Sequence, residues 1–599
     1  MEVNLSAQKS KAYIGNMPEA CGLNFFQADS NLSFLLNFYL SNEEYDKVLP
    51  LLTELGEVAG NELDELSREA DRNPPELVSF NKRGELVNEV KYHSSYERMK
   101  EIGYSQFGLV AMSHKDGVMG RSTPFTKVLK YSFWYLFAQS EFGLCCPMSM
   151  TDSAVSILKK FGSDDLKSRY LPSLLSTEMD QRWTAAQFMT EKQGGSDVGL
   201  NNVKAKKVGD HWKIWGDKWF CSNVSADVSL VLARPEDAPT GTAGLAMFLV
   251  PKRLEDGKHN YFKINRLKDK FGTRDMASGE VSFEGAIGYV VGDTNTGFKQ
   301  MMSMVNSSRL SNAVRSAGLM RRSYLEVLQT TRGRLAFGSP LIKLPLMRES
   351  VFEMLLDTEA AASAIFYTAK VFDRSENGCN SSKVLLRILT PILKGYVCKR
   401  ARYITTEAME IRGGNGYIED WVDSKLVRDA HVGSIWEGTT NIVALDVIRA
   451  IKKNQAGDEF FNDITNRVSS LQNHSVRRVA SIFLEIKDKV EQDIDQVIFK
   501  NNSVDHNIYA KEIMNNMYRL LVVSVWLEEA EYQIVKKQSY RKLFLVIHYL
   551  HRYFLSLGGT ASIFNEAILK WTDSVIDWEQ IPLEAIEELL PAIGNNYSI

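Results

Sequence analysis

The sequence predicts a mainly helical protein with a central β domain, and two observations support this fold class. Apolar residues recur at helical spacing in residues 1–185 and again in 296–599, whereas residues 186–295 contain short runs bounded by Gly, Asp and Pro. Because 599 residues are too many for one core, we expect four domains. They are an N-terminal helical domain (1–185), a small β-barrel (186–295), a helical bundle (296–455) and an extra C-terminal helical domain (456–599).

The N-terminal region is expected to be helical after a short irregular start. Helical periodicity is visible in residues 45–52 and in the aromatic run of residues 131–142. The prolines at positions 74 and 75 must interrupt a helix, because proline lacks an amide donor and restricts the preceding residue. Three aromatic residues of the second run are predicted to pack in the core: Trp134, Tyr135 and Phe137.

The central region has the pattern of a small antiparallel barrel or sandwich. Residues 211–215 alternate and are followed by Gly216-Asp217, a turn signal, and residues 228–232 and 247–250 are further strand candidates. A β insert between two helical layers leaves a crevice that suits a flat cofactor.

Composition and charge are typical of an ordinary soluble globular protein. The net charge of −3 gives no general reason to expect nucleic acid or an anionic membrane as a partner. Six scattered cysteines without a CxxC pair predict reduced thiols and no metal site. No apolar run reaches the ~18 residues that span a bilayer, and residues 1–6 lack a signal-peptide or Arg-rich pattern. We therefore expect an intracellular, soluble protein, with cytoplasm and mitochondrion both open.

The stretch from Ser434 to Ile442, Ser-Ile-Trp-Glu-Gly-Thr-Thr-Asn-Ile, is the strongest candidate for chemistry. Apolar residues at helical spacing follow it, so Glu437 is expected on a turn before a helix, with Thr439 or Thr440 as the cap. Burial between Ile435 and Trp436 would raise the pKa of Glu437 and make it a better base near neutral pH. From this stretch alone, a simple interaction of Glu437 with the helix dipole is equally compatible.

Four other stretches could bind a planar or anionic ligand. Residues 188–198 contain Gly-Gly-Ser with open backbone amides, without the spacing of a Walker A or a dinucleotide motif. Residues 216–223 place two aromatic side chains and a hydroxyl on a strand. An arginine in residues 332–338 suits pyrophosphate, and residues 410–417 offer glycine backbone. Each stretch alone is also compatible with ordinary turns and packing.

In this order, the stretches resemble the acyl-CoA dehydrogenase family. Met-Thr-Glu-Lys-Gln-Gly-Gly-Ser-Asp-Val resembles its Thr-Glu-x-x-x-Gly-Ser-Asp signature, and Ile-Trp-Glu-Gly-Thr-Thr-Asn-Ile resembles its catalytic Glu-Gly-Thr box. Residues 73–77, 146–151, 266–272 and 434–438 are similar to the AidB-like branch. That branch includes an alkylation-response flavoprotein and eukaryotic members with an extra C-terminal helical domain. The resemblance implies the acyl-CoA dehydrogenase fold with that extra domain.

The resemblance also implies a reaction. An FAD-dependent dehydrogenase would oxidise a fatty acyl-CoA, preferably of medium-to-long chain, while Glu437 removes the α-proton and a hydride passes to the flavin. The backbone N–H of Glu437 would help to polarise the thioester carbonyl. Electron-transfer flavoprotein would then accept the electrons. A flavin oxidase would differ mainly in its access to oxygen.

The matching positions give a full set of expected site residues. Arg309 and Ser196 would contact the substrate. Arg334 and Phe337 match an element that reaches the FAD of a neighbouring subunit, which implies a homo-oligomer, expected as a tetramer. The expected FAD-binding residues are Met189, Thr190, Gly195, Ser196, Phe220, Cys221, Ser222, Arg334, Phe337, Glu410, Gly413, Gly414, Thr439 and Asn441.

Three of the matched positions depart from the family pattern. Phe220 stands where Trp is usual, Glu410 where many members have Gln, and Asn306 where an acidic residue usually precedes Arg309. A carboxylate at position 410 would sit poorly beside pyrophosphate, and a neutral residue at 306 would loosen the thioester geometry.

The alternative function is that of a DNA-associated, AidB-like stress-response flavoprotein with little dehydrogenase activity. Residues 457–599 contain 14 Lys and Arg against 20 Asp and Glu, a net charge of −6, whereas phosphate binding needs the opposite sign. A local basic cluster keeps the alternative open, although a solvated helix face explains it better: Lys536, Lys537, Arg541, Lys542 and Arg552.

Overall fold

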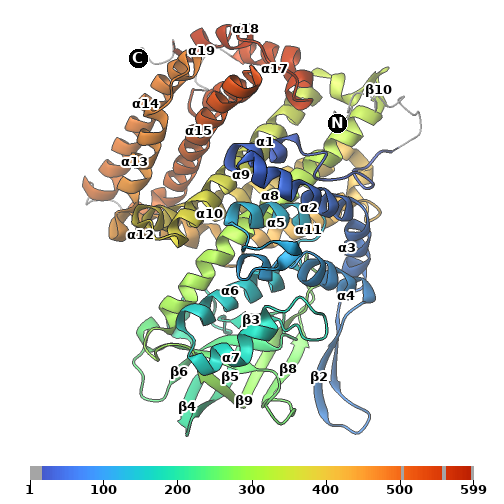
Figure 1. Ribbon diagram of the computed structural model, residues 1–599, viewed down its shortest axis with the longest axis vertical. Coiled ribbons are helices and arrows are strands. Elements are labelled where there is room, and N and C mark those ends of the chain that lie inside the picture. The colour runs from blue at the N-terminus through green and yellow to red at the C-terminus, as the bar shows by residue number, and fades with distance from the viewer. Residues whose placement is uncertain (1–16, 501–504, 556–560, 595–599) are drawn as a thin grey trace. The chain divides into compact units, whose positions relative to one another are not determined.

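The computed structural model describes residues 17–500, 505–555 and 561–594, and these divide into two compact units (Figure 1). One, the barrel unit, comprises Leu51–Arg315 and Arg428–Gly438. The other, the helical unit, comprises the described residues up to Pro50, Ser316–Val427 and the described residues from Thr439 onward. Residues 1–6, examined above for a targeting signal, lie outside the described residues.

The N-terminal part of the barrel unit is helical, as predicted, with one exception. The prolines at 74 and 75 follow the end of a helix at Arg72, and every residue of the aromatic run 131–142 is buried. The exception is an antiparallel hairpin, which follows from alternation in residues 76–91 that the helical prediction overlooked. The elements are α2 (Asn42–Gly60), α3 (Glu62–Arg72), β1 (Glu76–Phe80), β2 (Leu86–Lys91), α4 (Ser94–Lys100), α5 (Lys127–Ala138), α6 (Cys145–Phe161) and α7 (Asp164–Leu174).

The predicted β region is a closed barrel. Strand pairing runs β6-β4-β5-β9-β7 and returns to β6, while β3 pairs with β6 and β8 pairs with β9. Two pairings, β3 with β6 and β4 with β6, are parallel, so the prediction of a purely antiparallel barrel was wrong. The strands are β3 (Ala185–Phe188), β4 (Lys204–Val208), β5 (His211–Ser222), β6 (Val228–Pro235), β7 (Ala246–Pro251), β8 (Phe262–Leu267) and β9 (Ser278–Val290).

The expected turn at Gly216-Asp217 is absent, because β5 continues through it to Ser222. The pairing with β9 shifts register between Ile214 and Trp215, and Gly216 has φ +121°. The glycine therefore supplies a bulge within one long strand, a common use of glycine in strands. The continuation carries Phe220 and Ser222.

Strand β6 is buried on both faces, which explains its continuous apolar sequence. Val231 and Ala233 face the barrel interior together with Ile214 and Phe248. Leu230 and Leu232 belong to a second apolar cluster with residues of α6 and α7, which lie beside the strands in Figure 1. The barrel unit thus has helices packed on one outer face of its barrel.

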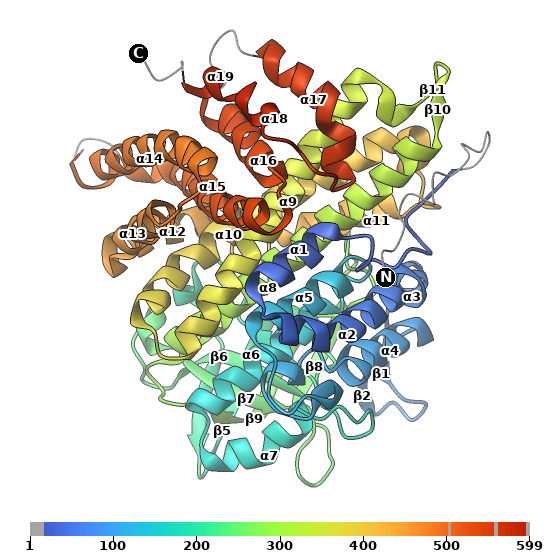
Figure 2. The same ribbon diagram turned by 45° about the horizontal axis from the view of Figure 1, so that its top comes forward.

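The helical unit combines the predicted bundle with the predicted C-terminal helices. Helix α10 contacts α9, α12, α13 and α15, and α14 and α15 lie side by side in Figures 1 and 2. Helices α2, α8 and α11 have residues in both units. The elements are α1 (Ser30–Tyr39), α8 (Gly297–Gly333), β10 (Leu335–Ala336), β11 (Ser339–Pro340), α9 (Pro345–Glu376), α10 (Asn380–Arg412), α11 (Val422–Gly433), α12 (Thr440–Asn454), α13 (Ala456–Ser469), α14 (His474–Asp495), α15 (Ala510–Lys537), α16 (Arg541–Leu550), α17 (Ala561–Ile576), α18 (Glu584–Glu587) and α19 (Leu590–Gly594).

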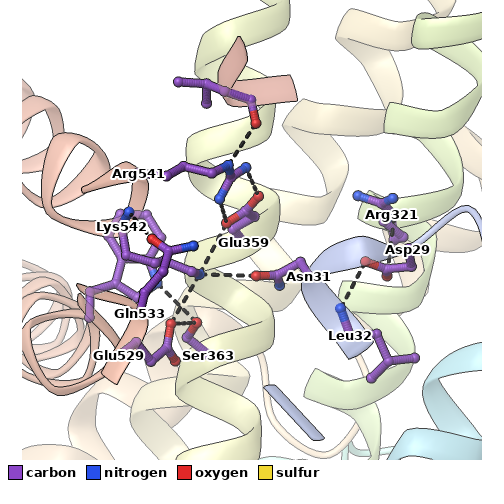
Figure 3. A network of polar contacts seen from close by, with 12 residues as sticks. Asp29, Asn31, Leu32, Arg321, Glu359, Ser363, Glu529, Gln533, Arg541 and Lys542 are labelled. Carbon is purple, nitrogen blue, oxygen red and sulfur yellow. Dashed lines mark hydrogen bonds and ion pairs between the residues drawn. The ribbon is translucent and has the colours of Figure 1, made fainter. Parts of the chain in front are cut away.

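A buried ionic network joins α16 to α9 and α15 inside the helical unit (Figure 3). Arg541 donates to both carboxylate oxygens of Glu359, at 3.1 and 2.5 Å. The Nζ atom of Lys542 lies 3.0 Å from the carboxylates of both Glu359 and Glu529, and it donates to the side chain of Asn31 on α1. Arg541 and Lys542 are fully buried.

This network overturns the interpretation of the basic cluster as a solvated helix face. Only Lys536 and Lys537 of its five members are exposed. Arg541 and Lys542 are neutralised by buried carboxylates, and Arg552 lies 3.1 Å from the carboxylate of Glu353. Sequence proximity alone could not reveal this, because Glu353 and Glu359 lie almost two hundred residues earlier in the chain. The cluster presents too few exposed cations to support DNA binding.

Three general expectations can be compared with the described residues. No described helix is long and apolar enough to cross a membrane. The six cysteines all lie in the described part, and none forms a disulfide bond, as predicted. In the same residues, no group of three or more His, Cys, Asp or Glu side chains is arranged to hold a metal ion.

Candidate active site

The segment that carries Glu437 is held within the barrel unit by contacts on both sides. At its start, Arg428 forms a bidentate ion pair with Asp71, with distances of 3.0 and 2.6 Å, and both side chains are almost fully buried. Farther along, the side-chain amide of Asn312 on α8 donates to the carbonyl oxygen of Gly433 at 2.9 Å. These contacts fix the end of α11 before the turn begins.

The loop after β8 packs directly on this segment. The backbone N–H of Thr273 donates to Asp429 at 2.6 Å. A Cβ atom on Gly272 would lie 2.4 Å from the carbonyl oxygen of Arg428, so only glycine fits this close approach. The Nζ atom of Lys270 donates to the carbonyl oxygens of Thr273 and Met276. Burial lowers the pKa of Lys270 to about 8. The stretch 266–272, noted above only for its resemblance, therefore positions the Glu437 segment.

Glu437 occupies a tight turn, as the sequence predicted. Its φ angle is +57° and that of Gly438 is +101°, both in the left-handed region. Helix α12 begins at Thr440, and Thr439 stands at the N-cap position, but its side chain makes no capping hydrogen bond. The side chain of Glu437 is only 12% exposed. The positive φ angle of a non-glycine residue marks a constrained position, which is common at functional sites.

Aromatic and apolar side chains pack around Trp436, next to Glu437, and a guanidinium lies near the carboxylate. Trp436 packs against the buried residues Cys146, Met150 and Met276 and stacks on Phe142, with ring centroids 5.9 Å apart. Nη2 of Arg315 lies 3.7 Å from Oε1 of Glu437. The sequence assigned neither Phe142, which ends the aromatic run, nor Arg315 to the site, because neither stands in a motif of the expected chemistry.

Cys146 is present in this pocket as a thiol at neutral pH. Burial raises its pKa to about 11, and the charge of Arg315 offsets only part of that effect. A protonated, buried thiol is a weak nucleophile, so the carboxylate of Glu437 is the stronger base in the pocket.

Arg309 contacts the backbone of Glu437. Its Nε donates to the carbonyl oxygen of Glu437 at 3.0 Å, and its Nη1 donates to the side-chain oxygen of Asn306 at 3.2 Å. The neutral residue at 306, unusual for the family, still orients Arg309 through a hydrogen bond. Arg309 thus shapes the Glu437 turn, and its expected contact with substrate stays a prediction.

Several expected FAD-binding residues of the barrel unit lie near one another. The N–H of Trp219 donates to the carbonyl oxygen of Thr190 at 2.9 Å, which brings the Gly-Gly-Ser loop beside β5. A Cβ atom on Gly195 would lie 2.6 Å from Oγ1 of Thr190, so the loop folds back on that hydroxyl. Ser196 is exposed, while Met189 and Thr190 are half-buried.

The next expected positions alternate along β5. Phe220 is 56% exposed and Ser222 is half-buried, on one face of the strand. Cys221 is fully buried and belongs to the interior core of the barrel. Its side chain therefore packs in the barrel, and only its backbone is available to a ligand on the other face.

Glu191 in the same loop was not predicted to have a role. Its carboxylate accepts hydrogen bonds from Lys218 at 2.7 Å and from the backbone N–H groups of Asn202 and Val203. It is almost fully buried, so it fixes the loop that presents Gly195 and Ser196. The glutamate of the Thr-Glu motif is the sequence signal for this structural role. The prediction assigned functions only to the residues beside it.

The remaining expected FAD-binding residues belong to the helical unit. Nη1 of Arg334 donates to the carbonyl oxygen of Arg412 at 3.1 Å, so Arg334 lies beside Gly413. Phe337 is 97% exposed at the tip of the β10–β11 hairpin, which projects from the helices in Figure 2. All of these residues are exposed: Arg334, Phe337, Glu410, Gly413, Gly414, Thr439 and Asn441.

These observations fit a flavin nucleotide in each unit taken separately. The barrel unit offers an exposed aromatic ring beside a glycine loop with open amides, and the helical unit offers an exposed guanidinium beside two exposed glycines. Aromatic rings suit stacking on a flat ring system, and a guanidinium suits pyrophosphate. The exposed carboxylate of Glu410 is the single unfavourable group in the set for an anionic ligand.

Comparison with known proteins agrees with the geometry. Residues 16–181 match the AidB N-terminal domain, 186–286 the acyl-CoA dehydrogenase middle domain and 295–452 the acyl-CoA dehydrogenase C-terminal domain. The chain is 34% identical over 438 residues to acyl-CoA dehydrogenase family member 11 of Caenorhabditis elegans, covering 71% of this chain and 70% of that protein. The chain belongs to the acyl-CoA dehydrogenase family.

A further relative and a solved structure agree with this membership and with the AidB-like branch. The putative acyl-CoA dehydrogenase AidB of Escherichia coli K12 is 35% identical over 416 residues, covering 68% of this chain and 74% of that protein. The crystal structure of C. elegans ACDH-11 in complex with C11-CoA superposes with a TM-score of 0.84 at 28% identity, covering 93% of this chain and 96% of that chain.

A more distant relative shows the shared fold alone. Butyryl-CoA dehydrogenase from Megasphaera elsdenii has a TM-score of 0.57 at 21% identity, and the match covers 69% of this chain and 99% of that one. The expected acyl-CoA dehydrogenase fold is confirmed, and the C-terminal helices are additional to it.

Proposed function

We propose that this family member is an FAD-dependent acyl-CoA dehydrogenase that forms a double bond between the α and β carbons of a medium-to-long-chain fatty acyl-CoA. The observation that carries the proposal is Glu437, a largely buried carboxylate on a left-handed turn, next to Trp436, which packs against Cys146 and Met150. A relative of this branch binds C11-CoA, which supports the chain-length preference.

In the proposed reaction, each of these residues would have a separate role. Glu437 takes the α-proton, which is only weakly acidic, so a desolvated base and a polarised carbonyl must act together. Arg309 holds the backbone of Glu437 through its carbonyl oxygen, and the apolar side chains around Trp436 exclude water from the carboxylate. When FAD is bound, it supplies the oxidising group that accepts a hydride from the β-carbon.

In the barrel unit, Phe220 and Ser222 on β5 would face the cofactor, and Gly195 and Ser196 would offer it backbone amides. In the helical unit, Arg334 would offer a cation, which the resemblance assigns to the cofactor of a neighbouring subunit. Because Phe337 is almost fully exposed beside Arg334, we further propose that this element reaches a second copy of the chain in a homotetramer. Electron-transfer flavoprotein is the proposed electron acceptor.

An anaerobic titration tests the proposal. The purified wild-type protein is mixed with acyl-CoAs from short to long chains, and loss of the oxidised flavin absorbance is followed. Glu437→Gln should keep its flavin while its reduction rate falls by roughly 100-fold or more. Glu284→Gln, an exposed carboxylate on β9, serves as the matched control and should behave as wild type. Reduction of Glu437→Gln at the wild-type rate would show that Glu437 is not the base.

Two additions to the same experiment address the other candidate functions. Oxygen consumption by acyl-CoA without an added electron acceptor would indicate an oxidase. A gel shift with duplex DNA at physiological salt, without flavin reduction by any acyl-CoA, would indicate the DNA-associated function. The buried state of Arg541 and Lys542 predicts no such shift.

A further inference from the structure

Arg315 is a buried cation whose position is not explained by the packing of its own helix. It lies on α8, six residues after Arg309, and its side chain is fully buried. Its Nε donates to the carbonyl oxygen of Ser311 at 3.3 Å, within the helix. By distance and angle its Nη1 and Nη2 atoms meet no hydrogen-bond acceptor among the described residues, although the guanidinium is close enough to the thiol of Cys146 to lower that group's pKa. A buried guanidinium with two unused donors is costly unless a nearby anion compensates it.

The compensating anion is Glu437. Nη2 of Arg315 and Oε1 of Glu437 are 3.7 Å apart, close enough for strong attraction and too far for a normal hydrogen bond. Burial disfavours a charged carboxylate, whereas a cation at this distance favours it. Arg315 therefore counteracts the effect of burial on the residue proposed as the base.

Two aromatic rings fix the guanidinium at this distance. The guanidinium carbon lies 5.4 Å from the ring centroid of Phe142 and 5.1 Å from that of Trp436. A cation over aromatic faces is stabilised without a hydrogen bond to the rings. Trp436 directly precedes Glu437, so the ring that contacts the guanidinium of Arg315 also belongs to the turn that positions the carboxylate.

We propose that Arg315 is a positioning residue that keeps the carboxylate of Glu437 ionised in its apolar pocket. The cation attracts the carboxylate, and the rings of Phe142 and Trp436 hold it beyond hydrogen-bond distance, so Glu437 stays able to accept a proton. This inference rests on the proposed function, in which Glu437 removes the α-proton of the thioester.

Other charged or titratable groups near Glu437 must be separated from the effect of Arg315. From the same helix, Arg309 contacts the backbone of Glu437. Cys146 on α6 is protonated at neutral pH, since burial raises its pKa to about 11. Lys270, on the loop after β8, acts on Cys146 through its charge, and its own pKa is lowered to about 8 by burial. A change near pH 8 could therefore come from Lys270.

The test compares Arg315→Gln, which removes the cation, with Arg315→Lys, which keeps it. The rate of anaerobic flavin reduction at saturating acyl-CoA is measured against pH in the full-length, flavin-loaded protein. In Arg315→Gln, the pH at which the reduction rate rises should be higher than in wild type by about one unit or more. At high pH the rates of the two proteins should converge. Arg315→Lys should stay near wild type. Lys270→Met should alter the profile near pH 8 and leave the rise at lower pH in place.

A second measurement reports on the carboxylate without turnover. Infrared difference spectra between each protein and its Glu437→Gln counterpart, recorded with oxidised flavin and no substrate, distinguish a protonated from an ionised carboxyl. With falling pH, the protonated form should appear in Arg315→Gln at a pH about one unit or more higher than in wild type. The same infrared titration in both proteins would overturn the proposal, as would a pH profile of the rate in Arg315→Gln that coincides with wild type.

The two variants keep the inference testable if one of them folds poorly. If Arg315→Gln is not recovered folded, Arg315→Lys decides, because a shift away from the wild-type profile in a variant that retains the cation would contradict a role of charge. If wild type is not reduced by any acyl-CoA at any pH, the proposed function fails. The infrared comparison still decides the role of Arg315 in that case.

Discussion

The guanidinium of Arg541 donates hydrogen bonds to both carboxylate oxygens of Glu359, and the two side chains are 0% and 3% exposed. They lie 182 residues apart in the chain, one on α16 and the other on α9. The guanidinium also lies over the ring of Trp578, 3.8 Å from its centroid. The additional C-terminal helices are therefore tied to the family's bundle by charges that cannot be separated without leaving one of them buried and unpaired.

The first prediction concerns the stability of this pair. Arg541→Met removes two hydrogen bonds to a charged group but leaves Glu359 with Lys542 as its remaining buried cation, so we expect a loss of about 1.5–3 kcal/mol of unfolding free energy. The measurement is the midpoint of urea unfolding, followed by the helical circular dichroism signal. Lys536→Met, an exposed lysine at the end of α15, is the control and should shift the midpoint little. Equal shifts in both variants would show that the ion pair does not stabilise the fold.

The second prediction concerns acid. Burial by itself would raise the pKa of Glu359, but Arg541 and Lys542 outweigh it and hold this pKa at about 2, below its ordinary value of 4.5. Because the folded-state pKa is lowered, the stabilisation is complete above pH 4.5 and is lost as the pH falls toward 2. The loss over this window is roughly 3 kcal/mol.

Unfolding free energies measured from about pH 6 down to pH 3 check this expectation. Glu359→Gln should be less stable near neutral pH and should lose less stability in acid than wild type. Burial raises the pKa of Glu529, so this neighbour titrates in the opposite sense and must be retained in both proteins. Parallel curves for wild type and Glu359→Gln would contradict the assignment of the acid loss to Glu359.

A third prediction concerns the close approach at Gly272. In Gly272→Ala the new Cβ would lie 2.4 Å from the carbonyl oxygen of Arg428, and this backbone is held by the ion pair of Arg428 with Asp71. We expect a cost of about 1–3 kcal/mol and slower flavin reduction, because the displaced segment carries Glu437. Thermal unfolding and the anaerobic titration measure the two effects.

Gly199→Ala is the matched control for this substitution. Its new Cβ would meet its nearest neighbour at 3.4 Å, an ordinary contact, so stability and reduction rate should stay close to wild type. If Gly272→Ala behaves like Gly199→Ala, the loop after β8 does not position the Glu437 segment.

The sequence predicted the fold and the catalytic candidate because both depend on local patterns. Helical and alternating periodicity predicted the helices and the barrel. The sequence pattern Trp-Glu-Gly-Thr-Thr predicted that Glu437 lies on a turn before α12. The hairpin of β1 and β2 was missed although its alternation is visible, since the surrounding helical pattern dominated the interpretation. The bulge at Gly216 was mistaken for a turn, because glycine serves both and only strand pairing distinguishes them.

What the sequence could not provide are contacts between distant segments. Arg315 stands in no motif, and its meaning arises only from its distance to Glu437, 122 positions later. In the sequence, Arg541 and Lys542 have the pattern of surface charges. In the structure they are buried beside the carboxylates of Glu359 and Glu529. Cys221 is a different case. A strand buries alternate side chains, so the residue between Phe220 and Ser222 must face the core, and its expected contact with FAD stays a prediction for its backbone alone.

The last prediction concerns the exposed element at the end of α8. Phe337 is almost fully exposed with φ +54°, and Arg334 lies beside Gly413, so both face outward in this chain. If they reach the flavin and the surface of a second copy, Arg334→Ala and Phe337→Ala should each lower flavin affinity by about tenfold or more and dissociate the oligomer in parallel. Flavin content per chain and sedimentation velocity are the measurements. Leu346→Ala, an exposed apolar residue on α9, is the control and should retain both properties. Full flavin occupancy in Arg334→Ala would show that this residue does not hold the cofactor, because the loss of a charged hydrogen-bond donor to an anionic ligand must lower the ligand's affinity.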